Sequence, residues 1–569
     1  MQNRRAVNAR SSSGQLTHRQ ILALLSGLMI GMFLAALDQT IVGTSIRTIA
    51  DDLQGLSLQA WATTAYLITS TISTPIYGKL SDIYGRRPFY LTAITIFVAG
   101  SLACTFSTSM YELAAFRALQ GLGAGGLMSL AFTIIADIMS PRERAKYQGY
   151  FFAIFGTSSV LGPVIGGFLA GQDTILGITG WRWVFLVNVP IGIIALAVVW
   201  HVFRLPHEPH DHRIDFRGAV FLIMGIVPLL IVVEQGHEWG WSSISSTSCY
   251  VIGLLGVALF IRVEAKMGDE ALIPLKLFNT SRFTMIIIAG FIVGIGMFGG
   301  ISMIPQYLQI VKGHTPTEAG LLMIPMTLGI MVGSIVSGQI TSRTGRYKIF
   351  PIIGTALMVV AMFLFYTVDV DTSIWQPTIF MTLFGLGLGN CMQTLTIAAQ
   401  NAVPRRDLGV ATASATFFRQ IGGTIGVTVF LSILFNTVTD GIKDAFTRIV
   451  PTPEFQFALK DPAVLSNPVN KPVLDALQGG GNAGVLQDSS FLQQVDPRLA
   501  RPFLEGFAES IDAVFLTGAF VMILAFVTTW FIKEIPLGAT WQDPDINTTQ
   551  VTEIAKGGQR LSWFLFADR

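Results

Sequence analysis

The chain has 569 residues, of which 51% are hydrophobic and only 13% are charged, and its mean hydropathy is +0.58. Soluble domains carry roughly 25% charged residues, so this composition excludes an ordinary soluble protein and indicates a membrane protein. The net charge of +2 gives no support for a nucleic-acid partner.

The amino-terminal segment is expected to be the first membrane helix. Several arginines precede an apolar stretch at 21–43, as in a signal peptide, but the stretch is too long for a signal and long enough to span a bilayer. Fourteen such stretches can be drawn, and because lipid offers no water to unpaired amides, all are predicted to be helices. Their centres lie near Met32, Ile68, Val98, Gly125, Val160, Leu196, Ile226, Leu255, Gly294, Gly329, Met358, Gly387, Val427 and Ala525.

Basic residues lie on one side of this predicted topology, as the positive-inside rule requires. The short outer loops hold Arg47, Arg182 and Lys312. The short inner segments hold Arg4, Arg5, Arg10, Arg19, Lys79, Arg86, Arg87, Arg142, Arg144, Lys146, Arg204, Arg213, Arg217, Arg262, Lys266, Lys276, Arg282, Arg343, Arg346, Lys348, Arg405 and Arg406. We therefore expect a multi-pass membrane protein with both termini cytoplasmic. We place it in the plasma membrane, and in a bacterial inner membrane rather than a eukaryotic one, although the topology would be the same in either.

An internal echo predicts two related halves. The segment 78–87, Gly-Lys-Leu-Ser-Asp-Ile-Tyr-Gly-Arg-Arg, is matched by Gly-Gln-Ile-Thr-Ser-Arg-Thr-Gly-Arg at 338–346. Eight predicted helices lie between these two segments, whereas two consecutive six-helix halves would place six there. We therefore expect an additional helix pair between the two six-helix halves. The predicted division is a cytoplasmic tail 1–20, an N-terminal half 21–204, a linker with the inserted pair 205–282, helices 9 to 13 at 283–437, an outer loop 438–508, helix 14 at 509–533 and a cytoplasmic tail 534–569. We expect the outer loop to form either a small folded cap or a flexible flap.

Two charged residues in the first half are candidates for one intramembrane site. Asp38 lies in the first span and Arg117 in the fourth, and an ionisable residue at membrane depth is a functional hypothesis by default. At 1.5 Å per residue, Asp38 lies roughly 25 Å from its inner end and Arg117 roughly 8 Å from its outer end, so both fall in the outer third of a core of about 30 Å. The alternative is that Asp38 is a helix-end acid facing outer water.

Arg419 is a further arginine at membrane depth, about 17 Å from the inner surface. It should face a cavity or a carboxylate, as a functional site or as a structural ion pair.

Neither a disulfide framework nor a metal site is predicted. The three cysteines lie singly in apolar runs, at Cys104, Cys249 and Cys391. The histidines at 207, 210 and 212 are interpreted as part of a solvated linker. We expect no cofactor and no metal.

These motifs together resemble the fourteen-helix drug/proton antiporters of the major facilitator superfamily, over nearly the whole chain except the tails and the outer loop. The segment with Gly78, Asp82, Gly85, Arg86 and Arg87 is similar to the superfamily's inner-gate loop, in which the acid and arginines latch the inner side closed. The helix-5 segment with Gly156, Gly162, Pro163, Gly166 and Gly167 resembles the antiporter motif of exporters, and Pro163 should kink that helix. Stretches 37–42, 117–126 and 181–190 are similar to three further motifs, and the resemblance assigns the arginine segment 117–126 to proton coupling.

Two departures from the family pattern concern the first helix and the second echo. Gly43 and Arg47 stand where the helix-1 motif usually continues with Asn and later Pro, and Arg47 could alter the proton affinity of Asp38. Ser342 replaces the acid in the second echo, so a latch in that half would lack its carboxylate.

The resemblance implies an all-α major facilitator fold and proton-coupled multidrug efflux by alternating access, with protons and small hydrophobic or cationic compounds as partners. The alternative within transport is an exporter of a lipid or other amphiphile, and a sensor or membrane enzyme is a remote one. No catalytic motif is found within the spans, so no enzyme is expected. Residues proposed to line a central cavity are Met29, Met32, Phe33, Tyr66, Phe132, Met297, Gln306, Tyr307, Met392 and Gln393.

Overall fold

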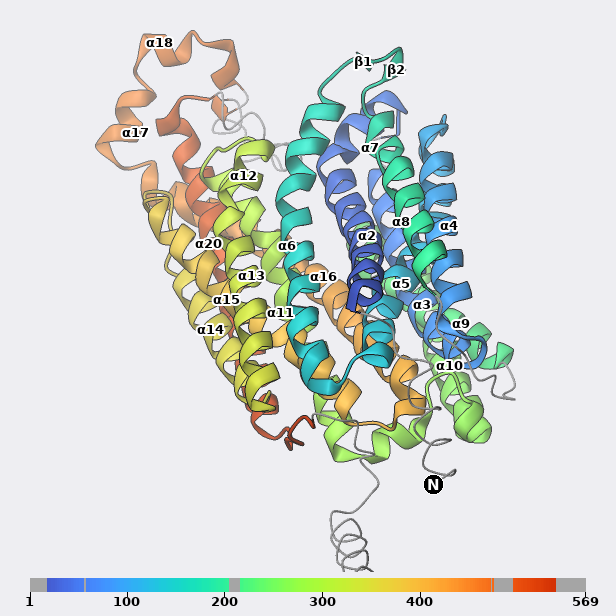
Figure 1. Cartoon of the computed structure of the whole chain (residues 1–569). Helices are drawn as coiled ribbons and strands as arrows, with labels where there is room; N and C mark the ends of the chain where they lie inside the picture. Colours follow the sequence, from blue (N-terminus) through green and yellow to red (C-terminus); the bar gives the residue numbers. More distant parts are fainter. Residues whose placement is uncertain (1–17, 56–57, 204–214, 472, 475–494, 539–569) are drawn as a thin grey trace, which may run out of the picture.

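The computed structural model describes residues 18–55, 58–203, 215–471, 473–474 and 495–538 (Figure 1). The predictions for most of the two tails, the histidines of the linker and the middle of the outer loop lie outside these residues. No group of three or more metal-ligating side chains that could hold a metal ion is present in the described ranges.

The N-terminal half is a bundle of long helices with a small hairpin at one end. Its elements are α2 His18–Asp52, α3 Gln59–Tyr84, α4 Arg86–Thr105, α5 Met110–Ile138, α6 Pro141–Ala170, β1 Thr174–Ile175, β2 Ile178–Thr179, α7 Arg182–Leu186 and α8 Asn188–Val202. The two-residue strands pair antiparallel, with Thr174 opposite Thr179. The all-α prediction missed this hairpin, whose turn is made by Leu176 and Gly177, both at positive φ, as a type I′ turn requires.

The rest of the chain forms the inserted pair and the C-terminal half. The inserted pair is α9 Phe216–Trp239 and α10 Ile244–Met267, followed by η2 Gly268–Glu270 and η3 Leu275–Asn279. The C-terminal half contains α11 Ser281–Gln306, η4 Tyr307–Val311, α12 Pro316–Leu322, α13 Ile324–Thr344, α14 Ile349–Phe365, α15 Trp375–Asn401, η5 Arg405–Asp407, α16 Leu408–Ile449, α17 Pro453–Ala458, α18 Pro462–Leu465, η6 Pro468–Asn470 and α20 Pro497–Trp530.

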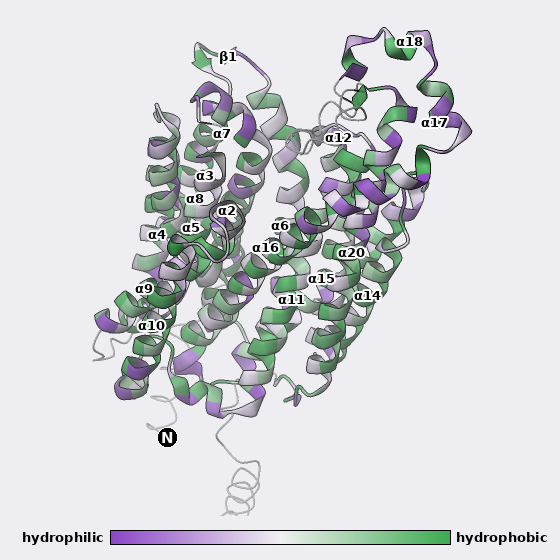
Figure 2. Ribbon diagram, turned by 180° about the vertical axis from the view of Figure 1, so that it is seen from behind, coloured by the Kyte–Doolittle hydropathy of each residue, from purple (hydrophilic) through white to green (hydrophobic). Residues whose placement is uncertain are grey.

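The helices agree with the predicted spans. Within the described residues, eleven helices are long and apolar enough to cross a membrane. The three further predicted spans coincide with α3, α14 and α15, which are shorter or richer in hydroxyl side chains. Apolar residues run along the helices, whereas hydrophilic ones gather at the two ends of the bundle (Figure 2). The polytopic all-helical fold class is confirmed.

The two halves meet mainly along two pairs of helices, α6 against α13 and α3 against α16, with further contacts of α6 with α12 and α15 and of α5 with α16. The inserted helix α9 touches both α3 and α16. The inserted pair therefore bridges the halves at their edge rather than separating them. We call the end with the α3–α4 connection, near the N-terminus in Figure 1, the basic end, and the end with α17 and α18 the cap end.

The predicted outer loop is shorter than expected, because its flanking helices are longer. Helix α16 continues to Ile449 and α20 begins at Pro497, so both extend into the segment 438–508. Charged residues in these extensions lower the hydropathy, but each extension keeps one buried apolar stripe. Between the helices, the described residues form a small folded cap with α17 and α18. Arg498 bonds to Asp461 and Asp496 there, and its hydrogen bonds hold the pKa of Asp496 below the usual range.

Glycines allow α5 to lie directly against α3. A Cβ added at Gly121 would lie 2.4 Å from the carbonyl oxygen of Tyr66, and one at Gly125 would lie 2.3 Å from that of Ser70. Real carbon and oxygen atoms do not approach so closely, so only glycine fits. This close contact between small residues also brings Arg117 of α5 against α3, where it contacts Ala62 and Tyr66.

Replacing Gly125 with alanine should lower the free energy of unfolding by about 1–3 kcal/mol, because the new methyl group must push α5 away from α3. Gly43→Ala is the matched control, since a Cβ at Gly43 would meet nothing within 4 Å. Thermal unfolding in detergent should show a lower melting temperature for Gly125→Ala only. Equal melting temperatures for both variants would contradict the close contact.

Candidate functional site: a buried ion pair between helices α2 and α5

The structure brings the two predicted charged residues of the N-terminal half into contact. Asp38 on α2 is 0% exposed and Arg117 on α5 is 1% exposed, and the guanidinium Nη1 lies 2.5 Å from the carboxylate Oδ2. The alternative prediction, that Asp38 faces outer water, is wrong because the surrounding helices bury its carboxylate completely. Such a pair is costly to dehydrate, so its geometry and further hydrogen bonds decide whether it is stable.

Two amide side chains complete the hydrogen bonding of the carboxylate. Gln120 donates its Nε2 to Asp38 Oδ1 at 2.8 Å, and Asn188 donates its Nδ2 to the same oxygen at 2.7 Å. Gln120 also accepts a bond from Arg117 Nη1 at 2.7 Å. The two carboxylate oxygens therefore accept three side-chain hydrogen bonds, one from a guanidinium and two from amides.

Sequence reasoning missed both amides, although each left a signal. Gln120 lies three residues after Arg117, hence on the same face of α5. Asn188 lies in the stretch 181–190, which was noted as typical of the family without a role. The N-terminal turn of α8 places Asn188 beside the middle of α2.

A second layer of contacts orients these groups. Ser101 on α4 accepts a bond from Asn188 at 3.1 Å and donates to the carbonyl of Phe185 at 2.9 Å. Arg117 donates from Nε to the carbonyl of Ala62 at 3.3 Å, and its guanidinium carbon lies 4.0 Å from the centre of the Tyr66 ring. Five helices, α2, α3, α4, α5 and α8, therefore contribute to one charge network.

The two residues at which the first helix departs from the family pattern, Gly43 and Arg47, lie away from this network. Both are on the exposed face of α2, and no ion pair of Arg47 is found in the described part of the chain. The effect proposed for Arg47 on the proton affinity of Asp38 stays a prediction.

Helix α6, which carries the antiporter-like segment, lies between the two halves. On one side, a Cβ at Gly162 would lie 2.1 Å from Thr40 Oγ1 and one at Gly166 would lie 2.6 Å from Thr44 Oγ1, so α2 approaches closely. On the other side, Pro163 lies against Gly320 of α12. The helix continues through Pro163.

The two remaining glycines of this segment also face the C-terminal half. A Cβ at Gly156 would lie 3.1 Å from Thr327, and one at Gly167 would lie 3.2 Å from Thr317. Through α6, the helix that carries Asp38 is coupled to the opposite half of the protein.

The inner-gate segment holds the two halves together at the basic end. Asp82 Oδ2 accepts a bond from the backbone N–H of Val410 on α16 at 3.0 Å. Arg86 forms ion pairs with Asp82 and with Asp137, the latter at 2.8 Å. Gly78 lies against Ala413 of the same C-terminal helix.

The other two residues of the inner-gate segment have different roles from these. Gly85 ends α3 with φ of 97°, a backbone conformation that favours glycine. Arg87 lies away from the latch: it donates to the carbonyl of Trp200 at 2.9 Å and faces that indole ring. The family resemblance implies that both arginines take part in the latch. In the structure, Arg86 bridges the two carboxylates, whereas Arg87 contacts α8.

Glutamines add uncharged contacts between the halves near the latch. Gln148 on α6 donates to Gln400 on α15 at 3.1 Å, and Gln400 donates to the carbonyl of Phe132 on α5 at 3.2 Å. Gln393 on α15 donates to the carbonyl of Ala145 on α6. With the Asp82 contacts, they show a conformation in which the halves are closed together at the basic end.

Arg419 does not meet a carboxylate in the described part of the chain. Its guanidinium is 8% exposed, and its Nη1 donates to Thr396 Oγ1 at 3.4 Å. Of the two surroundings predicted for Arg419, a carboxylate is therefore not found among the described residues, and its role as a functional site stays a prediction.

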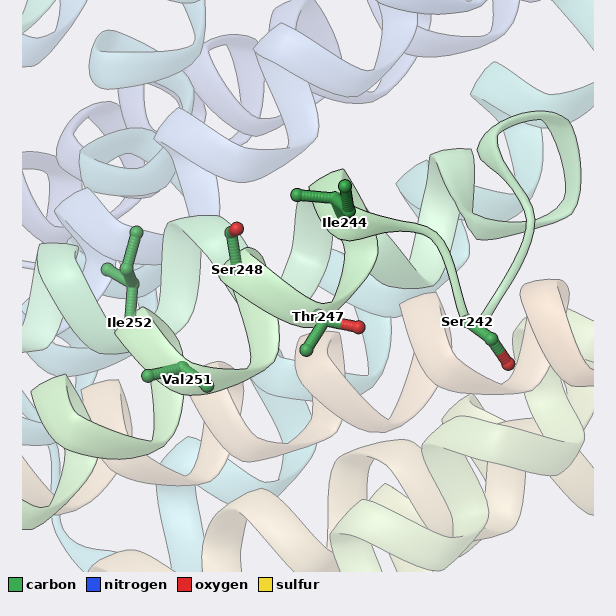
Figure 3. A pocket seen from close by; sticks show the side chains of 6 residues that line it. All are labelled: Ser242, Ile244, Thr247, Ser248, Val251 and Ile252. Carbon is green, nitrogen blue, oxygen red and sulfur yellow. The ribbon is translucent and has the colours of Figure 1, made fainter.

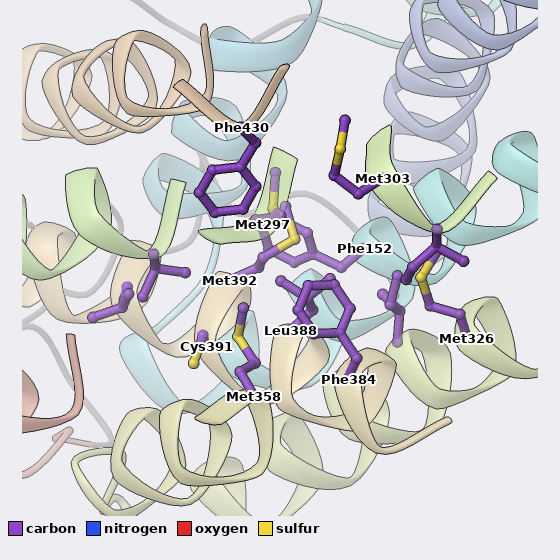
Figure 4. Packing of buried hydrophobic residues seen from close by; sticks show 14 of the residues in the cluster. Phe152, Met297, Met303, Met326, Met358, Phe384, Leu388, Cys391, Met392 and Phe430 are labelled. Atoms are coloured by element: carbon purple, nitrogen blue, oxygen red, sulfur yellow. The ribbon is translucent and has the colours of Figure 1, made fainter. Parts of the chain in front are cut away.

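Most residues proposed to line a cavity are packed in the core instead. Met32, Tyr66, Phe132, Met297, Tyr307, Met392 and Gln393 are buried, and Met29, Phe33 and Gln306 are half-buried. Figure 4 shows Met297, Met392 and Phe152 in this packing. A pocket of about 410 Å³ lies elsewhere, on the outer face of α10, where it is lined by Ser242, Ile244, Thr247, Ser248, Val251 and Ile252 (Figure 3).

The fold is a bundle of helices long and apolar enough to cross a membrane, arranged in two halves that contact each other at the basic end, with an ion pair buried in the N-terminal half. The family model described as Major Facilitator Superfamily matches residues 28–427, and the chain belongs to this superfamily.

Comparisons with known proteins agree with this assignment. The chain is 36% identical over 536 residues to the multidrug transporter protein MdtP of Bacillus subtilis (strain 168), covering 93% of this chain and 95% of that one. It is 32% identical to multidrug resistance protein 3 of the same organism, covering 90% and 95%. Among solved structures, the proton:xylose symporter XylE bound to 6-bromo-6-deoxy-D-glucose has the same fold, with a TM-score of 0.56, 14% identity and coverage of 91% and 97%.

Removing one member of the buried pair should cost more than removing both charges. Arg117→Met leaves the Asp38 carboxylate buried without its cation, at a cost of roughly 3–5 kcal/mol. Adding Asp38→Asn should restore much of the lost stability, because no buried charge is left. Melting temperatures in detergent should rank wild type first, then the double variant, then Arg117→Met. Additive losses would contradict a direct ion pair.

Proposed function

We propose that the protein is a proton-coupled multidrug efflux antiporter that exports hydrophobic or cationic compounds by alternating access. The observation that carries this proposal is the completely buried Asp38, held by Arg117, Gln120 and Asn188 at membrane depth. A carboxylate that must exchange between this ionised network and a protonated form is suited to carry a proton. Two relatives with multidrug names support drug efflux.

The contacts suggest how protonation would change the conformation. A proton on Asp38 removes its charge, weakens the bond to Arg117 and turns one acceptor oxygen into a donor. Helix α2 lies against the glycine face of α6, and α6 lies against α12 and α13. Movement of α2 would therefore reach the interface between the halves, where the Asp82–Val410 contact and the glutamine contacts open or close the basic end.

The direction of transport follows from the topology. The basic end is cytoplasmic by the positive-inside rule, and the cap end then faces outward, so both termini are on the cytoplasmic side of the plasma membrane. Asp38, near the middle of α2, would be protonated from outside and deprotonated toward the cytoplasm. Inward proton flow would thereby drive export.

Export of a lipid or other amphiphile is the second candidate, and the folded cap is the observation that favours it. The cap exposes two large apolar side chains, Phe457 at 71% and Leu465 at 51%. Such side chains at the outer face could receive an apolar molecule on its release.

Inverted vesicles with an acidic lumen test the coupling directly. Adding a cationic dye such as ethidium should release protons from the lumen in wild type, reported by dequenching of a pH dye. Asp38→Asn should abolish this release, because the side chain no longer takes up a proton. Asp51→Asn, at the exposed end of the same helix, is the matched control and should retain it.

Full activity in Asp38→Asn would mean that another acidic residue carries the proton. If wild type responds to no cationic dye, multidrug efflux would be contradicted and export of an amphiphile would be favoured.

A further inference from the structure

Arg419 is a buried cation whose charge no carboxylate balances in the described part of the chain. It lies in the middle of the predicted span of α16, about 17 Å from the basic end, and only 8% of the residue is exposed. A cation at this depth costs about 2.5–3.5 kcal/mol on insertion scales. Asp38 has its guanidinium and Asp82 has Arg86, whereas the neutral hydroxyl of Thr396 is the contact of Arg419.

The partner of Arg419 lies on the face of α15 that looks toward the N-terminal half. Thr396 is three residues after Gln393 and four before Gln400, so the three share one helix face. Both glutamines bond to the opposite half, Gln393 to Ala145 and Gln400 to Gln148. The guanidinium of Arg419 is therefore attached to the seam between the halves rather than to the lipid-facing surface.

The same face of α15 also carries apolar side chains. Thr396 is four residues after Met392, so the two side chains lie on one face of the helix, and Met392 belongs to the same buried cluster as Met297 and, from the N-terminal half, Phe152 (Figure 4). The helix face that holds the partner of Arg419 therefore contributes to an apolar surface made by both halves. An apolar wall with few polar anchors is the composition typical of small-molecule sites.

Opening of the basic end would change the surroundings of Arg419. In the described conformation the glutamine contacts hold the face of α15 that carries Thr396 against the N-terminal half. If the halves separate there, as alternating access requires, these contacts break and the guanidinium faces a cavity open to the cytoplasm. Arg419 would then be accessible while the substrate is loaded and covered once the basic end closes. Such a cation would bind an anionic group of the substrate on loading and release it when the basic end closes.

We propose that Arg419 is a substrate-binding residue for a carboxylate, and that the exported compounds include amphiphiles with one carboxylate on an apolar body. The inference rests on the proposed export cycle and extends its substrate range beyond hydrophobic and cationic compounds. A guanidinium binds a carboxylate with two parallel hydrogen bonds, which a lysine does not reproduce. Thr396 orients the guanidinium while the site is empty.

The test compares two dyes that differ in one charge: a rhodamine with a free benzoate and its methyl ester. Initial rates of uptake into energised inverted vesicles are measured for wild type, Arg419→Gln, Arg419→Lys and Arg406→Gln. Arg419→Gln should reduce uptake of the free acid by at least about tenfold relative to the ester, the effect of one lost charge-assisted hydrogen bond. Arg419→Lys should show a smaller loss. Arg406→Gln, at a 66% exposed arginine near the start of the same helix, should leave both rates unchanged.

Equal effects of Arg419→Gln on both dyes, or no effect on either, would overturn the proposal. A wild-type measurement does not depend on the folding of any variant: the KM for the free acid should be several-fold lower than that for the ester. Equal or reversed KM values, or no uptake of the free acid, would also overturn it. If uptake of the free acid depends on Arg419 but no protons are released, the proposed proton coupling would be refuted. The same result would still support the proposed carboxylate site at Arg419.

Discussion

The cost of burying a charge in a membrane governs the organisation of this protein. A carboxylate is costly to bury in an apolar bundle without partners, and the structure supplies Asp38 with a guanidinium and two amides at 2.5–2.8 Å from its oxygens. Each partner comes from a helix other than that of the aspartate. The N-terminal half is therefore held in register around one carboxylate, and any change in its protonation reaches five helices at once.

The close approach of these helices depends on glycine. Helix α5 lies so near α3 at Gly121 and Gly125 that a methyl group would overlap a carbonyl oxygen, and α2 lies as near α6 at Gly162. In lipid, where apolar side chains gain little from leaving the solvent, such contacts supply much of the packing energy. They also form smooth surfaces, which suits halves that move against each other.

The basic end shows how contacts of different strength are combined across the two halves. Asp82 and Arg86 form a charged latch with α16 and α5, while Gln148, Gln393 and Gln400 add neutral hydrogen bonds beside it. Hydrogen bonds between neutral groups contribute only about 0.5–1.5 kcal/mol each. A seam closed in this way can open without leaving several charges buried alone.

Much of this arrangement could be predicted from the sequence. Hydropathy and the distribution of basic residues gave the spans, and depth arithmetic alone placed Asp38 and Arg117 together. The amides at 120 and 188 were not found in this way, because the depth argument paired charged residues and a neutral amide adds nothing to the charge pattern. The ends of α16 and α20 were also misplaced, since their amphipathic extensions resemble loop in composition. The predicted cavity residues are mostly buried in the described conformation, some of them within their own half, as Tyr66 is against Arg117 and Gly121 of α5.

The protonation of Asp38 is the central claim of this account, and infrared difference spectroscopy on the purified protein in lipid measures it directly. A carboxylic acid C=O band should appear as the pH falls, be missing in Asp38→Asn, and diminish when an exported substrate is added at constant pH. A carboxylate at position 38 that stays ionised across the pH range, with no response to substrate, would contradict the account.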